Sequence, residues 1–248
     1  GEATLFPNQV TEFLKRTKDK PFISRELQTE GSNIAKGKEK YGHLLETWKN
    51  NGLDLVAVSM YHYDAQKNYQ AFNPKYKTPY EISGLIEKIK SRDLKVRLSC
   101  VMLKDYIDSI DEVANLIDFS RKNGVHQLTL RRADIPSNSR NDEVAQYILK
   151  NRVNGRKWDQ ELLGYLESCG KLEKTLPHGA LIYDVNGQNV AITTGLSPEF
   201  SKLNKTLEQD ETIKEKKTLE QELRQLIFIP PNLLTTSWED IIGGRIDL

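Results

Sequence analysis

The segment KVRLSCVMLKDYIDSIDEVANLIDFSRKNGVHQLTLRR (residues 95–132) decides the fold class. It begins and ends with short runs rich in β-branched and apolar residues, 95–103 and 126–132, which predict strands. Between them, residues 109–124 carry apolar side chains at three- and four-residue spacing, which predicts a helix with one buried face. Two strands joined by such a helix are expected to run parallel, with a right-handed connection.

The predicted helix carries its own start and stop signals. Ser109 stands where an N-cap is expected, and Glu112 occupies the capping-box position three residues later. Gly124 follows the last residues of the periodic pattern, at a position where a glycine commonly ends a helix. These signals support the strand–helix–strand interpretation of the segment.

The same alternation extends toward the N-terminus. Strand-like runs occupy residues 21–29 and 53–61, and helix-like periodicity covers 9–17 and 79–93. Four strands that alternate with helices predict an α/β fold of parallel βα units, arranged as an open or closed βα barrel.

The pattern changes in the C-terminal half. A helix is predicted over 157–170, and two strand-like runs follow at 180–185 and 189–194. They flank Asn186-Gly187, a dipeptide that favours a two-residue turn because both residues tolerate a positive φ. The sequence therefore predicts a β-hairpin here.

Charged residues dominate 201–225 and predict a solvated helical excursion rather than a binding surface. The runs 224–231 and 233–238 could add strands beside the hairpin. We therefore expect residues 1–136 to form a partial (β/α) barrel of parallel strands, and residues 137–248 to form a small C-terminal α+β appendage.

Composition limits the possible functions. The chain has 248 residues and a formal net charge of +1, so it has no overall field that would attract nucleic acid or an anionic membrane. No stretch approaches the ~20 apolar residues of a membrane span, and the N-terminus lacks a signal-peptide pattern. The two cysteines, Cys100 and Cys169, form no Cys-x2-Cys motif, so we expect no disulfide framework and a cytoplasmic setting.

Ligands of parallel βα folds bind at the carboxyl ends of the strands, so the residues that end each predicted strand are candidates. Small hydroxyls, glycines, a carboxylate and arginines at one rim suit a polar, zwitterionic or phosphorylated ligand. The candidates are Gly1, Glu2, Thr29, Glu30, Gly31, Ser59, His62, Tyr63, Ser99, Arg131, Arg132 and Asp134.

The order of these stretches resembles that of radical S-adenosylmethionine (SAM) enzymes. Within that superfamily the chain is most similar to the branch that contains the molybdenum-cofactor cyclase and the peptide-modifying enzymes, over about residues 1–136. The resemblance is carried by Gly-Glu-x-Thr-Leu (1–5), Thr-Glu-Gly (29–31), LDLVAVSMYHYD (53–64), KVRLSCVML (95–103) and DSIDEVANLIDFSRKNGVHQLTLRR (108–132).

The resemblance assigns roles to residues of the first two stretches. The family's Gly-Gly-Glu segment binds the amino group of SAM, and Gly1 and Glu2 would be its last two residues, with Ala3 where proline is commoner. The family's Thr-Asn-Gly after the next strand would begin at Thr29. Glu30 stands where the family has asparagine, which is a departure from the pattern.

Further roles follow for the later strands. Ser59 would lie near the SAM ribose, and Ser99 would contact the ribose or the carboxylate, at a position where asparagine is common. Arg131 or Arg132 would face SAM or the substrate. Neighbours on a strand point to opposite faces, so only one of the two arginines can face the barrel interior, and the one that does is expected to have an anionic partner.

The family's cluster loop, Cys-x3-Cys-x2-Cys, holds a [4Fe-4S] cluster through three thiolates. Cys100 and Cys169 cannot replace it in number or spacing. We therefore expect the chain to be a fragment that lacks the first strand, the cluster loop and the first helix, and to be inactive alone.

The resemblance also implies the reaction of the full-length parent, which is oxidoreductase chemistry on a TIM-barrel-like scaffold. SAM is cleaved reductively to a 5'-deoxyadenosyl radical, which abstracts a hydrogen from a substrate. The implied cofactors are SAM and a [4Fe-4S] cluster, and the implied partners are an electron donor such as flavodoxin or ferredoxin and an unknown small-molecule or peptide substrate.

Two other functions remain open. The chain could be a cofactor-free barrel lyase or isomerase, which would need a lysine or a carboxylate pair at the strand ends. It could also be a non-catalytic barrel that binds a SAM-like ligand or a protein. On position alone, Ser59 and Ser99 are more often simple core or rim hydroxyls, and His62 is more often structural than a ligand contact. The hairpin could present His178, Asp184 or Asn189 to a substrate.

Overall fold

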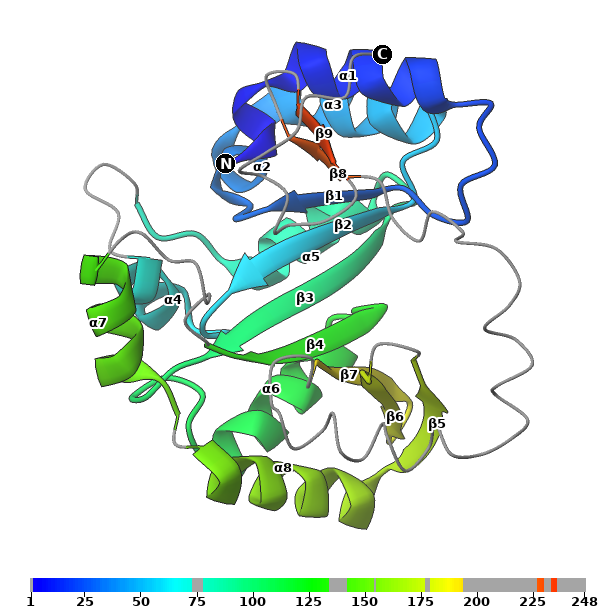
Figure 1. The fold of residues 1–248 in the computed structure, drawn as a ribbon. Coiled ribbons are helices and arrows are strands. Elements are labelled where there is room, and N and C mark those ends of the chain that lie inside the picture. The colour runs from blue at the N-terminus through cyan, green and yellow to red at the C-terminus, as the bar shows by residue number, and fades with distance from the viewer. Residues whose placement is uncertain are drawn as a thin grey trace.

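The structure is a computed structural model. It describes residues 2–72, 78–133, 142–153, 155–176, 179–193, 227–229 and 233–235. Its centre is a seven-stranded sheet with the order β1-β2-β3-β4-β7-β6-β5 (Figure 1). The strands of this sheet are β1 (Glu26–Thr29), β2 (Leu55–Met60), β3 (Lys95–Met102), β4 (Gln127–Arg132), β5 (Lys171–Thr175), β6 (Leu181–Val185) and β7 (Gln188–Thr193).

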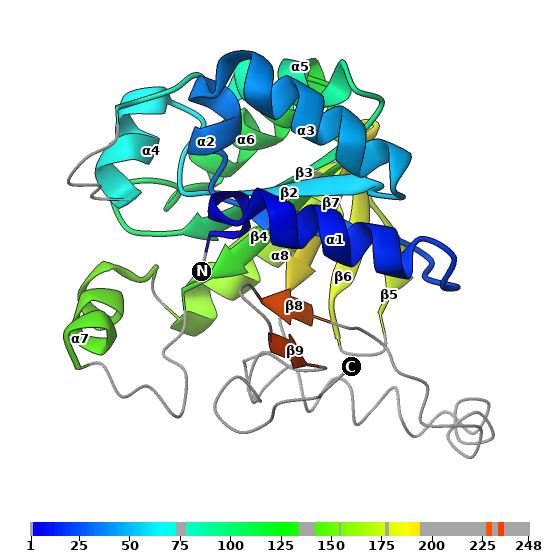
Figure 2. The same ribbon diagram turned by 90° about the horizontal axis from the view of Figure 1, so that it is seen from above.

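The first four strands are parallel, as the alternation of strands and helices predicts. Helices α2, α3, α5 and α6 gather on one side of the sheet (Figure 2). The helices of the described chain are α1 (Pro7–Thr17), α2 (Ser32–Lys36), α3 (Lys38–Asn50), α4 (Ala65–Phe72), α5 (Ile82–Lys90), α6 (Ile110–Lys122), α7 (Asp142–Asn151) and α8 (Gly155–Cys169), with the 3-10 turn η1 (Ala3–Leu5).

Alternate residues of the strands build the hydrophobic core on the helix-covered face. Val56, Val58 and Leu98 from the central strands are fully buried, and the apolar stripe of α5 packs in the same cluster. At about 25 cal/mol for each Å² of apolar surface removed from water, this cluster is the main source of stability. The opposite, inner face of the sheet is more polar and carries the candidate site.

The predicted elements around α6 are confirmed. Ser109 caps the helix by accepting a hydrogen bond from the Glu112 amide at 3.2 Å. Gly124 follows the helix with a φ of 64°. The predicted turn is confirmed too, because Asn186 and Gly187 have φ values of 51° and 84°, the positive values that a type I′ hairpin requires.

The hairpin belongs to the main sheet, because β7 pairs with β4 in parallel and with β6 antiparallel. The expected α/β fold is confirmed, and the barrel is open rather than closed. The division into domains at residue 136 stays a prediction.

The strands expected within 224–231 and 233–238 are present, but they do not lie in the sheet of the hairpin. The strands β8 (Ile227–Ile229) and β9 (Leu233–Thr235) pair with each other in a separate two-stranded sheet. The charged stretch 201–225 lies outside the described residues. Among the described helices, none has the length and apolar character needed to cross a membrane.

Candidate functional site

Three hydroxyl side chains lie side by side on the inner face of the sheet. Ser59 of β2 is in register with Ser99 of β3, and Ser99 is in register with Thr129 of β4. Neighbouring strands are about 4.8 Å apart, so the three residues, here called the hydroxyl row, form a line across the sheet. In the described part of the chain none of the three hydroxyls has a hydrogen-bond partner. The row therefore offers three donors and acceptors to a ligand.

The row stands above a floor of paired polar groups. Arg97 lies one step below the row on β3 and forms an ion pair with Glu26 of β1 at 2.5 Å. The pair crosses over β2 at Ala57, whose small side chain leaves room for it. Gln127 on β4 donates a hydrogen bond to Asn189 of β7 at 2.6 Å. These pairs engage Arg97 and Gln127, although Arg97 Nε is buried and has no hydrogen-bond partner among the described residues.

The structure decides which arginine faces inward. Arg131 is two residues beyond Thr129 and shares its face, whereas Arg132 lies on the other face and forms an ion pair with Asp159 of α8 at 2.6 Å. The expectation of an anionic partner for the inward arginine stays a prediction. Arg131 is exposed and makes no hydrogen bond or close ion pair within the described residues. Desolvation by the surrounding protein, the largest cause, lowers the pKa of Arg131, and the charge of Glu26 acts in the opposite direction.

Glu2 and Thr29, which are 27 residues apart, meet at the end of β1. The Thr29 hydroxyl donates to Glu2 Oε1 at 2.7 Å, and the Glu30 amide donates to Glu2 Oε2 at 2.8 Å. The Thr4 amide also donates to Oε1, at 3.0 Å. The Glu2 carboxylate therefore connects the N-terminal segment to the carboxyl end of β1.

Thr29 does not join the hydroxyl row. It is in register with Val58, so its side chain lies on the face opposite to Ser59. Gly1, the other predicted residue of this segment, lies outside the described residues.

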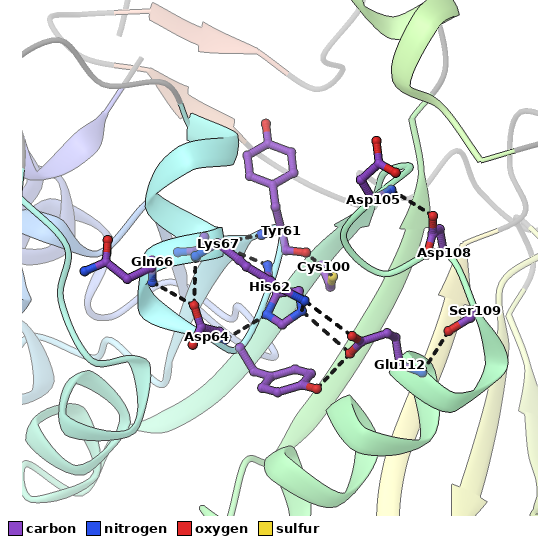
Figure 3. Close-up of polar contacts among 12 residues, drawn as sticks. Tyr61, His62, Asp64, Gln66, Lys67, Cys100, Asp105, Asp108, Ser109 and Glu112 are labelled. Atoms are coloured by element: carbon purple, nitrogen blue, oxygen red, sulfur yellow. Dashed lines mark hydrogen bonds and ion pairs between the residues drawn. The ribbon is translucent and has the colours of Figure 1, made fainter.

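The histidine after β2 belongs to a structural cluster (Figure 3). His62 is 2% exposed and its Nδ1 accepts a hydrogen bond from the Asp64 amide at 2.8 Å. Its Nε2 faces Glu112 Oε2 at 3.6 Å, and Tyr63 donates its hydroxyl to the same oxygen at 2.7 Å. Lys67 Nζ lies 3.5 Å from Glu112 Oε1. The cluster joins the loop after β2 to the first turn of α6.

The titratable groups of the cluster influence one another's pKa values. Burial, and then the charge of Lys67, lower the pKa of His62. Burial and the hydrogen bond to Glu112 raise the pKa of Tyr63 to about 12. Burial acts to raise the pKa of Glu112, but the Tyr63 hydroxyl and the nearby His62 and Lys67 lower it overall. His62 is therefore neutral near pH 7, while Glu112 is ionised.

Two of the predicted hairpin side chains form hydrogen bonds within the sheet and its turn. Asp184 accepts a hydrogen bond from the Gly187 amide at 2.6 Å and so stabilises the turn. Asn189 accepts the hydrogen bond from Gln127 and so lies with the paired polar groups below the hydroxyl row. His178 lies outside the described residues.

The described residues do not fit a [4Fe-4S] cluster. Cys100 is fully buried in the core-facing side of β3, where burial raises the pKa of its thiol. Cys169 ends α8. Within the described ranges no group of three or more His, Cys, Asp or Glu side chains could hold a metal ion.

Two parts of the site are not among the candidates from the sequence. Thr129 is one of them, although the alternation in HQLTLRR (126–132) places it on the same face as Arg131. The Glu26–Arg97 pair had no signal in the sequence, because its partners are on strands that only the fold brings together.

Comparisons with known proteins support the fold. No family model matches the chain, and no curated protein matches it. A crystal structure of Streptococcus suis SuiB bound to S-adenosylmethionine is similar with a TM-score of 0.56 and 12% identity, covering 99% of this chain and 49% of that chain. A second SuiB crystal structure has a TM-score of 0.55 and 11% identity, with 100% and 51% covered. The chain thus spans about half the length of these structures, and at this identity the likeness shows the fold alone.

Proposed function

We propose that the inner face of the sheet binds S-adenosylmethionine and that the chain is part of a radical SAM enzyme. The observation that carries the proposal is the hydroxyl row, whose three unpartnered hydroxyls lie beside the exposed Arg131. SuiB, which has a similar fold, was crystallised with SAM bound. The resemblance of the sequence to radical SAM enzymes supports the same ligand.

Each part of the site has a distinct role in the proposal. The hydroxyls of Ser59, Ser99 and Thr129 hydrogen-bond to the ribose diol of SAM. Arg131, one step nearer the carboxyl end of β4, binds a carboxylate of SAM or of the substrate, because guanidinium and carboxylate form strong charge-assisted bonds. Glu2 orders the rim through Thr29 and the Glu30 amide.

For the whole enzyme we propose the radical SAM reaction, in which SAM yields a 5'-deoxyadenosyl radical that abstracts a hydrogen from a small-molecule or peptide substrate. An electron donor such as flavodoxin or ferredoxin belongs to the same proposal. The described residues do not fit the [4Fe-4S] cluster that this reaction uses. Their part is to bind SAM, orient it and exclude water.

A binding module without catalysis is the second candidate, and the same hydroxyl row favours it. A cofactor-free lyase or isomerase has less support. In the parallel strands β1 to β4, the inner-face positions nearest the carboxyl ends are Gln28, Ser59, Val101 and Arg131, which supply neither a lysine nor a carboxylate pair.

Calorimetric titration of the chain with SAM tests the proposal. Thr129→Val keeps the side-chain shape and removes a hydroxyl, so we expect SAM to bind about five- to tenfold more weakly, the effect of one lost hydrogen bond. Ser99→Ala should act similarly. Ser168→Ala is the matched control, because its exposed hydroxyl bonds only to the Tyr165 carbonyl at the end of α8, and it should leave the affinity unchanged.

Equal SAM affinities of the row variants and the control, or no SAM binding at all, would contradict the proposal. A second measurement separates the enzyme from the binding module. Production of 5'-deoxyadenosine by the complete, anaerobically reduced enzyme, and its loss in Thr129→Val, supports catalysis. SAM binding without this product supports a binding module.

A further inference from the structure

A second hollow lies outside the inner face, at the rim after β1 and β2. It is a cavity of about 120 Å³ between α2, α4 and the segment 78–80. Helix α4 faces it with residues at the i, i+3, i+4 and i+7 positions, which is the spacing of a single helix face. The lining residues are Glu30, Ser32, Ala65, Asn68, Tyr69, Phe72, Thr78 and Tyr80.

Asn68 is the polar group at the centre of the α4 face. It is 2% exposed, and its Oδ1 accepts hydrogen bonds from the amides of Tyr61 at 2.8 Å and His62 at 3.3 Å. These bonds fix the orientation of the carboxamide, because an amide N–H needs the oxygen rather than the nitrogen. The Nδ2 amide group is then the part of the side chain that can contact a ligand in the cavity. It donates no hydrogen bond to any described residue. An amide donor at a cavity wall with no protein acceptor among the described residues favours a ligand that supplies an acceptor.

The walls of the cavity suit a flat ring. Phe72 is held by an edge-on contact with Tyr61, with ring centroids 4.8 Å apart and an interplanar angle of 71°. Tyr80 donates its hydroxyl to the Glu30 carbonyl, and burial raises the pKa of Tyr80, so its ring stays neutral and fixed. Aromatic walls interact with a bound ring through offset or edge-to-face contacts.

The volume limits the ligand to one ring. An apolar cavity of about 150 Å³ binds benzene, so a cavity of about 120 Å³ has room for a single five- or six-membered ring. A fused purine would exceed it.

We propose that this cavity, the rim pocket, binds an aromatic nitrogen heterocycle of pyridine or imidazole size, whose ring nitrogen accepts a hydrogen bond from Asn68 Nδ2. The ring lies between Phe72 and Tyr80. The rim pocket is separate from the hydroxyl row, because α4 and α2 line it rather than the inner face of the sheet. The proposal therefore does not depend on SAM binding.

Titration of the ¹⁵N-labelled chain with pyridine and with benzene tests the proposal. We expect pyridine to bind about five- to tenfold more tightly than benzene, the effect of one hydrogen bond. Pyridine, and not benzene, should move the side-chain NH2 signal of Asn68 downfield. Asn68→Asp keeps an oxygen for the Tyr61 and His62 amides and removes the donor, so the preference for pyridine should disappear.

A second variant covers the case in which Asn68→Asp does not fold. Ala65→Leu places a larger side chain at the cavity wall while it keeps the Asn68 amide donor, and it should abolish binding of both rings. Gln70→Leu, at an exposed position of the same helix, is its control and should bind pyridine normally. Equal affinities for pyridine and benzene, binding that leaves the Asn68 signal in place, undiminished binding in Ala65→Leu, or no binding of either ring to the unmodified chain would each overturn the proposal.

Discussion

A buried histidine at the end of β2 makes the stability of the protein depend on pH. His62 accepts a hydrogen bond from the Asp64 amide, so the proton of the neutral ring is on Nε2, facing Glu112. Burial and the charge of Lys67 lower the pKa of His62 in spite of the two nearby carboxylates, Asp64 and Glu112. The folded protein therefore favours the neutral ring.

We predict that the free energy of unfolding falls as the pH drops below about 6.5, the pKa of histidine in an unfolded chain. Above that pH the ring is neutral in both states and contributes no pH dependence. Below it the unfolded chain takes up a proton that folded His62 resists, until the pH reaches the lowered folded pKa. One such group changes stability by up to about 1.4 kcal/mol per pH unit.

Urea unfolding between pH 8 and pH 5 measures this effect against His62→Asn. The asparagine amide oxygen can replace Nδ1 as the acceptor for the Asp64 amide, and asparagine does not titrate. We expect the difference in stability between the two proteins to be constant above pH 7 and to change below it. A difference that stays constant down to pH 5 would show that His62 does not resist protonation.

At the scale of single elements, two glycines with open space around them should respond in opposite directions to alanine. Gly187 has a φ of 84° in the hairpin turn, whereas Gly164 lies inside α8, and a Cβ at either position meets no atom within 4 Å. Gly187→Ala should lose about 1 kcal/mol of stability, because alanine is strained at a positive φ. Gly164→Ala should gain about 0.5–1 kcal/mol, because glycine is the weaker helix former.

Chemical denaturation of both glycine variants checks the pair, and each serves as the control for the other. Since neither new methyl group meets a neighbour, only the backbone conformation distinguishes them. A loss of stability in both variants would show that the added methyl groups clash, and that the turn is not the cause.

At the scale of the whole molecule, one parallel pairing joins the two halves of the chain. Residues of β7 pair with β4, and Leu166 of α8 is fully buried in the same core cluster. Gln188 adds a hydrogen bond to the Val125 carbonyl at 3.3 Å. The sheet therefore continues past residue 136 without a break in its hydrogen bonding.

We predict that the fragment 1–136 does not fold stably, because it lacks the strand that pairs with β4 and the helix that covers the core. The fragment 1–193 contains all seven strands of the main sheet and should fold. Amide NMR spectra of the two fragments provide the measurement. Dispersed signals from 1–136 alone would contradict the prediction and support an independent domain with its boundary at that residue.

Much of the fold was predictable because its signals are local. The N-cap at Ser109 and the turn at Asn186-Gly187 depend on residues within a few positions of each other, and both are found where the sequence predicts them. The candidate site was predictable only in part. Ser59 and Ser99 lie in register as neighbours, but Thr29 is on the other face, because a strand's side-chain direction depends on its register with its neighbour.

The sequence by itself determined the parallel α/β architecture, the hairpin and the helix ends, since periodicity, caps and turn residues act through the nearby backbone. Only the tertiary structure decided which side chains meet: Thr129 with the hydroxyl row, Arg131 rather than Arg132 on the inner face, and Glu26 with Arg97. These contacts join strands that are far apart in the chain. Their register is set by how the whole sheet and its helices pack, which no local pattern encodes.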